Sequence, residues 1–211
     1  MENNGGNADN RGVRKAWLVA LFLVIPLLSL SAWRILYAEE YYQLYHEHLH
    51  HYPDDTMEDI YYLETALKAD FANPLYALTP VKDKTEWERY RALFSMHMNL
   101  KLIACYLTLG NKYDKMAAYF YNAPWKRQNL ESLDTAEQVY KVAYRYWTKA
   151  REWSAKAWAL RDIHLDKIEE WQDENFRIET GDLNYQETID NQLTRLAKVR
   201  ADFQKMDKNT Y

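Results

Sequence analysis

The feature that most constrains this chain is an uncharged, strongly apolar stretch close to its start. It reads AWLVALFLVIPLLSLSAW over residues 16–33, and basic residues flank it on both sides. About twenty apolar residues rising 1.5 Å each cross a bilayer core as a helix, because a helix satisfies its own backbone polar groups there. We therefore predict a transmembrane anchor helix over residues 16–37.

The charges around this stretch predict its orientation. Three basic residues precede it, and two glutamates follow soon after Arg34. Because basic residues favour the cytoplasmic flank, we expect a disordered cytoplasmic leader over residues 1–15. The rest of the chain is then periplasmic, held at the inner membrane by a single pass. A cleaved signal peptide is the alternative, with Ser29-Leu30-Ser31 as a weak cleavage site.

The composition favours helices with an aromatic core. The chain has 18 Tyr and 8 Trp but only 5 Gly and 5 Pro, and no long stretch alternates apolar and polar residues as a strand does. Cys105 is the only cysteine, so no intramolecular disulfide forms, and we expect it to be a buried small hydrophobe. The 31 acidic residues outnumber the 27 basic ones, which argues against nucleic acid as a partner.

Helix start signals divide the chain beyond the anchor. We expect a juxtamembrane helix over residues 38–54 that continues from the anchor and places its first tyrosines at the membrane interface. Pro53 would stop this helix, and a helical periplasmic domain would follow over residues 55–211. Capping-box spacings predict helix starts at Asp55 with Glu58, Thr85 with Glu88, Asp134 with Glu137 and Asn184 with Glu187.

Glycines and apolar spacing predict where these helices end. Gly110 would end the helix that opens at Thr85, and a shorter helix would follow over residues 114–121. The run that opens at Asp134 meets no further Gly or Pro before Gly181. The last helix carries an apolar seam made of Ile189, Leu193, Leu196, Val199, Phe203 and Met206. Two long amphipathic helices around one glycine predict a final antiparallel hairpin.

Two short stretches resemble parts of a tetratricopeptide repeat. Residues 61–70, YYLETALKAD, resemble the second helix of a repeat, and CYLTLG over residues 105–110 resembles the turn between its two helices. The equivalent alanines, Ala66 and Ala123, are 57 residues apart, which is no multiple of the repeat length. A degenerate tetratricopeptide-like all-α domain and an ordinary helical bundle therefore both stay open.

Two longer stretches carry a more specific resemblance. ALKADFANPLYAL over residues 66–78 and YDKMAAYFYNAPW over residues 113–125 resemble a family of small spirochaete envelope proteins. Members of that family have one N-terminal anchor and a helical periplasmic region, and some belong to the collar of the periplasmic flagellar motor. The resemblance implies a scaffold, without catalytic residues or cofactor, that packs against other envelope or flagellar-motor proteins. A second copy of the chain is a further candidate partner, and a secretion-associated periplasmic chaperone is the alternative function.

One pattern would suit an enzyme. His46-Glu47-His48-Leu49-His50 matches H-E-x-x-H, in which the outer histidines lie one helical turn apart and bind zinc. His51 adds a donor, and Glu64 is a candidate third ligand. Because Pro53 follows so soon, we expect a solvated or interface helix end with no bound metal. A metal patch, a pH-sensitive patch and a membrane-tethered zinc hydrolase stay as alternatives.

Four tryptophans are the candidate protein-interaction residues: Trp147, Trp153, Trp158 and Trp171. Most large rings pack in a core or between two helices. Any that stays exposed would anchor an interface, because an aromatic ring buries a large area at a small entropy cost.

Overall fold

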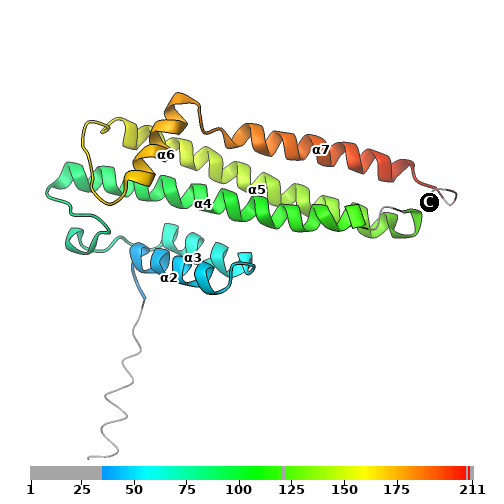
Figure 1. Ribbon diagram of the computed structural model, residues 1–211, viewed down its shortest axis with the longest axis horizontal. Helices are drawn as coiled ribbons and strands as arrows, with labels where there is room; N and C mark the ends of the chain where they lie inside the picture. The colour runs from blue at the N-terminus through cyan, green and yellow to red at the C-terminus, as the bar shows by residue number, and fades with distance from the viewer. Residues whose placement is uncertain (1–34, 120–121, 208, 210–211) are drawn as a thin grey trace, which may run out of the picture. The chain divides into compact units, whose positions relative to one another are not determined.

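Six α-helices and no β-strand make up the part of the chain that the computed structural model describes, residues 35–119, 122–207 and 209 (Figure 1). The predicted anchor helix over residues 16–37 lies outside these residues except for residues 35–37, which are described and are not helical. The helices are α2 (Ala38–His51), α3 (Thr56–Lys68), α4 (Lys84–Tyr119), α5 (Lys126–Trp158), α6 (Glu169–Thr180) and α7 (Tyr185–Lys205). Two single 3₁₀ turns, η1 (Pro74–Tyr76) and η2 (Ala123–Trp125), lie between them. The predicted all-α class is confirmed within the described residues.

Helix α4 is the centre of the bundle. Every residue from Arg89 to Leu100 is buried except Arg91, so this segment is covered on all sides. A helix that is apolar all round must lie inside a protein or a membrane. The stretch Lys84–Lys115 is indeed long and apolar enough to cross a bilayer, but 61% of its apolar window is buried against the other helices. Its apolar surface is therefore largely used by the bundle itself.

Helices α5 and α7 run along α4 in alternating directions (Figure 1). Gly110 faces Tyr140 and Arg89 reaches Leu160, so α4 and α5 are antiparallel and share the largest interface. Small and large residues alternate on the buried face of α5, where they are Leu133, Ala136, Tyr140, Ala143, Trp147 and Ala150. The predicted seam of α7 is confirmed, since Ile189, Leu196, Phe203 and Met206 are buried and Leu193 and Val199 are half-buried.

Helix α2 begins independently at Ala38, so the prediction that it continues from the anchor is wrong. The backbone of Tyr37 is extended, and Tyr37 forms an isolated bridge with Asp70 after α3. Glu40 holds this start by accepting the backbone N–H of Tyr37 at 3.0 Å. The helix ends at His51, just before Pro53, as predicted. Its residues Tyr42 and Tyr45 are buried in the core, which contradicts their expected place at a membrane interface.

Gly110 does not end a helix, because α4 continues to Tyr119 and includes residues 114–119 of the segment predicted as a separate helix over residues 114–121. The glycine answers a packing need instead. A Cβ atom at this position would lie 2.4 Å from Cε1 of Tyr140, so only glycine lets the two long helices approach here. The inter-helix turn of the tetratricopeptide resemblance is therefore absent at residues 105–110.

The start of α4 and both ends of α5 differ from their predicted positions. The cap of α4 is Asp83, two residues before the predicted Thr85, since Asp83 accepts the N–H of Glu86 at 2.9 Å. Glu86 in turn accepts the N–H of Lys82 at 2.7 Å. The long run from residue 134 starts earlier, at Lys126, and breaks after Trp158. The buried Arg89 donates to the carbonyls of Leu160 and Ile163, which holds the chain outside the helix.

The starts at Asp55 and Asn184 are confirmed, because each side chain accepts a backbone N–H of the first turn. Gly181 adopts the left-handed conformation that ends α6. However, the final hairpin is not formed by two helices around this glycine. Helix α7 instead returns along α5, with Tyr185 against Trp147 and Arg200 paired with Asp134, while the short α6 packs on both α4 and α5.

Candidate functional site

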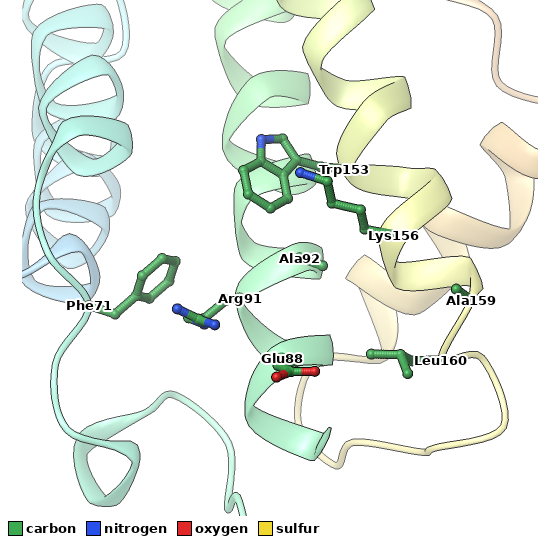
Figure 2. A pocket seen from close by; sticks show the side chains of 8 residues that line it. All are labelled: Phe71, Glu88, Arg91, Ala92, Trp153, Lys156, Ala159 and Leu160. Carbon is green, nitrogen blue, oxygen red and sulfur yellow. The ribbon is translucent and has the colours of Figure 1, made fainter. Parts of the chain in front are cut away.

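A surface groove of about 480 Å³ lies where α4, α5 and the segment after α3 meet (Figure 2). Its lining combines aromatic, charged and small side chains: Phe71, Glu88, Arg91, Ala92, Trp153, Lys156, Ala159 and Leu160. The short side chains of Ala92 and Ala159 leave room between two helices that are otherwise close-packed. The result is a concave site of the size that binds a few side chains of a partner.

The two cations of the groove lie on aromatic rings. Nζ of Lys156 is 3.8 Å from the centroid of the Trp153 ring, and Figure 2 shows the two side chains together. The guanidinium carbon of Arg91 is 5.9 Å from the Trp87 ring. Neither cation pairs with a carboxylate among the described residues, whereas Glu88 is paired with Lys84 at 3.8 Å. The groove therefore offers two uncompensated positive charges beside apolar surface.

Packed aromatic rings hold one wall of the groove in place. Phe71 makes edge contacts with the rings of Trp87 and Phe94, at centroid distances of 5.9 and 5.2 Å. Trp87 in turn stacks on the buried Tyr90 at 5.2 Å. Because these rings belong to the core, the groove is preformed, and a partner would not have to order it.

A second site is a buried polar network around His97 of α4. Nε2 of His97 lies 3.0 Å from the hydroxyl of Tyr42, and Nδ1 lies 2.6 Å from a carboxylate oxygen of Glu174. The ring is fully buried and stacks on Trp171 at 5.0 Å. Burial raises the pKa of Tyr42, so its phenol keeps its proton and donates to Nε2. Nε2 is then the acceptor nitrogen, and we assign the single ring proton to Nδ1, which donates to Glu174.

This network also contains the only convergence of three metal-type ligands found among the described residues. One ligand atom each of His97, Glu170 and Glu174 lies within 4.8 Å of the other two. Nζ of Lys101 is 3.2 Å from Glu170 and supplies positive charge to the pair of carboxylates. Burial opposes ionisation of Glu170, but Lys101 outweighs it and holds the pKa of that carboxyl below its usual value. Each residue of the trio thus has a protein partner, and the network joins α2, α4 and α6.

Sequence reasoning overlooked His97, Glu170 and Glu174. The available signals were a lone histidine inside the apolar stretch SMHMNL and two glutamates one helical turn apart. Neither pattern indicates that α6 folds back onto α4, so the pairing could not be inferred.

Comparison with known proteins gives one result. A family model described as a domain of unknown function, DUF8513, matches residues 85–206, which is more than half of the chain. The chain belongs to the DUF8513 family. No curated protein and no solved structure matches it. The DUF8513 region comprises nearly all of α4 and the whole of α5 to α7, so it supplies both long walls of the groove and the α4 and α6 residues of the His97 network.

The H-E-x-x-H pattern lies outside the DUF8513 region, at the exposed end of α2. Its helix does place His46 and His50 one turn apart, with His51 exposed beside them. The middle histidine, His48, donates from Nδ1 to a carboxylate oxygen of Asp59 of α3 at 2.8 Å. Glu64, the considered third ligand, instead accepts hydrogen bonds from two tyrosines. Among the described residues, three ligand atoms therefore converge at His97 and not at the candidate histidines His46, His50 and His51.

The structure separates the four candidate tryptophans into two pairs. Trp147 and Trp171 are each only 4% exposed and belong to the core, so they are unsuited to a surface contact. Trp153 and Trp158 of α5 are half-buried. Trp153 lines the groove, and Trp158 lies 6.2 Å from Phe176 of α6. Of the four candidates, Trp153 is therefore the tryptophan best placed to anchor a partner.

Cys105 is buried on α4, as predicted. Burial raises the pKa of its thiol to about 12, so the reactive thiolate is scarce at neutral pH. The only cysteine of the chain thus serves packing.

Proposed function

We propose that this protein is a membrane-anchored interaction subunit of an envelope assembly. The apolar stretch over residues 16–33 would anchor it in the inner membrane, and the helical region from residue 38 would act as a scaffold in the periplasm. The spirochaete resemblance suggests the collar of the flagellar motor as that assembly. The observation that carries the proposal is the preformed groove of Phe71, Arg91, Trp153 and Lys156.

The chemistry of the groove suits protein recognition. Tryptophan and arginine are the side chains that most often dominate the binding energy of interfaces, usually in a well-packed central pocket. The two uncompensated cations favour a partner segment that presents carboxylates next to apolar side chains. The membrane anchor would raise the local concentration of any partner in the same membrane, so a contact of this size suffices.

A periplasmic chaperone is the second candidate, because the groove is concave and apolar in part. A chaperone would bind many unrelated unfolded segments, whereas a scaffold binds one partner. The rigid aromatic wall of the groove favours the scaffold, since a client-binding surface has to adapt to different sequences.

Photo-cross-linking in living cells tests the proposal. A photoreactive amino acid at Ala159, which is exposed in the groove, should capture one defined envelope protein or a second copy of this chain. The same group at Gln138, exposed on α5 outside the groove, should not. Arg91→Glu should abolish the capture, and Arg127→Glu, which reverses an exposed charge elsewhere on α5, should leave it intact.

The same cells should place a C-terminal reporter fusion outside the cytosol. Capture of many unrelated proteins from Ala159 would favour the chaperone. Equal capture from Gln138, or a cytosolic reporter, would overturn the scaffold proposal.

A further inference from the structure

The most exposed large apolar side chains of the described residues are neighbours in the turn η1. Leu75 is 86% exposed and Tyr76 is 76% exposed. Leu36 and Tyr37, where the described chain leads into α2, are also exposed, at 50% and 41%. Single exposed hydrophobes are common on proteins, but a projecting pair is a candidate contact surface.

The exposure of Leu75 and Tyr76 is built into a fixed turn. Asn73 caps the turn, with its side chain accepting the N–H of Leu75 at 3.1 Å and its carbonyl accepting that of Tyr76 at 2.8 Å. Pro74 occupies the first position of the turn. Before it, Phe71 is packed into the core, so the projecting residues are anchored from behind.

Backbone contacts place this turn at the end of the bundle where the chain enters it. The N–H of Ala38 donates to Asp70 at 2.9 Å, and the N–H of Ala72 donates to Glu39 at 2.9 Å. Leu75 follows Ala72 by three residues, so it lies within about 11 Å of a backbone atom fixed to the start of α2. Figure 1 shows the beginning of α2 beside the segment that follows α3.

The predicted anchor would place the membrane surface near this same end of the bundle. The uncharged stretch ends at Trp33, and only two residues separate it from Leu36. A chain of that length spans about 11 Å at most, so an anchor in residues 16–33 would hold the entry of α2 at the bilayer surface. Leucine and tyrosine suit that zone, where an apolar body enters the acyl region and a phenol stays with the headgroups.

We propose that Leu75 and Tyr76 insert into the interface of the membrane that holds the chain. This turn would be a second attachment to the membrane, in addition to the anchor. The two attachments would fix the orientation of the bundle relative to the membrane. The turn Pro74–Tyr76 itself carries no charged side chain, so the expected attraction is apolar and independent of lipid charge. The inference rests on the membrane anchor of the proposed function, but not on the groove or its partner.

Depth-dependent fluorescence quenching tests this contact on the full chain in phosphatidylcholine nanodiscs. Cys105→Ala provides a cysteine-free background, and an environment-sensitive dye is attached at Leu75→Cys, Met57→Cys or Leu23→Cys in separate samples. Met57 is 61% exposed and lies at the far end of α3, about 17 Å along the helix from Lys68. Nitroxide-bearing lipids report which dyes reach the bilayer.

We expect a blue shift and several-fold stronger quenching at residue 75 than at residue 57, together with strong quenching at residue 23. Tyr76→Asp should reduce the quenching at residue 75, and Tyr61→Asp on exposed α3 surface should not. The same result is expected in nanodiscs that contain anionic lipid.

The outcomes separate this inference from the proposed function. Quenching at residue 23 without quenching at residue 75 would overturn the insertion of the turn and leave the anchor intact. Equal quenching at residues 57 and 75 would overturn it as well, because the bundle would then lie on the bilayer without using this turn. Absence of quenching at residue 23 would overturn the anchor, and the insertion with it.

Discussion

The two halves of α4 are tied to their neighbours by polar clusters of similar composition but different exposure. In the first half, Tyr42 and Glu174 bind the fully buried His97. In the second half, Tyr140 and Arg195 bind the buried Asp114. Each cluster joins three helices through a tyrosine hydroxyl and a carboxylate. The helices are α2, α4 and α6 in the first cluster, and α4, α5 and α7 in the second.

The difference lies in which partner can return to water. The side chain of Arg195 is 50% exposed, so its guanidinium can be solvated when its partner is lost. The side chain of Glu174 is only 14% exposed, and Tyr42 is buried. A buried polar group left without a partner costs its full desolvation energy. The His97 cluster should therefore be the more sensitive of the two, although both contain similar numbers of hydrogen bonds.

The largest expected effect is that of His97→Leu. The substitution introduces an apolar side chain of similar bulk and removes the acceptor of the Tyr42 hydroxyl and the donor to Glu174, which should lower the free energy of unfolding by about 3 kcal/mol. Urea denaturation of residues 36–211 measures this. His164→Leu, at a histidine that is 67% exposed, should change stability by less than about 0.5 kcal/mol. A loss at His97 as small as that at His164 would contradict the comparison.

Asp114→Ala should have the next largest effect, about 2 kcal/mol. The hydroxyl of Tyr140 retains its other partner, the side-chain oxygen of Asn111 at 2.9 Å, and Arg195 turns to water. Thermal and urea unfolding both report the loss. Asp134→Ala is the matched control, because Asp134 also pairs with an arginine of α7 but is 68% exposed. If Asp114→Ala cost more than His97→Leu, exposure of the surviving partner would not be the deciding factor.

Gly110→Ala should destabilise by about 1 to 2 kcal/mol, although alanine has the better helix propensity. The added Cβ meets the Tyr140 ring, which its hydrogen bonds to Asn111 and Asp114 hold in place. A double-mutant cycle with Tyr140→Leu measures the effect, since the smaller side chain should relieve part of the cost of alanine. Independent, additive effects of the two substitutions would show that the contact is not the cause.

These sites also show what the sequence could and could not predict. Predictions from local or periodic patterns are confirmed, namely the Asp55 and Asn184 caps and the apolar seam of α7. The predictions that Gly110 ends a helix and that the run from residue 134 continues past Trp158 are wrong. The glycine is required by Tyr140, and the break is held by Arg89, and both of these residues lie on another helix. The His97 network and the groove join segments more than fifty residues apart, and no single-sequence pattern encodes such pairings.

A third tyrosine–carboxylate cluster lies at Glu64, and the smallest effect is expected there. It extends the comparison of polar clusters to the dependence of stability on pH. Its Oε1 accepts hydrogen bonds from Tyr106 and Tyr146, each at 2.7 Å, and its Oε2 pairs with Lys68 at 3.3 Å. Burial opposes ionisation, but these partners outweigh it and hold the pKa of Glu64 below its ordinary value of 4.5.

A carboxyl whose pKa is lowered in the native state stabilises the fold at pH values above the unfolded pKa, and this contribution is lost as the pH falls through the native pKa. Glu64→Gln should therefore be less stable than wild type at neutral pH. Its free energy of unfolding should fall less steeply than that of wild type below pH 4.5, because it has no carboxylate to lose. Unfolding measured from pH 7 to pH 3 tests this, with Glu47→Gln on the exposed side of α2 as the control. Parallel acid limbs for wild type and Glu64→Gln would mean that the two tyrosines bind the protonated carboxyl as well as the carboxylate.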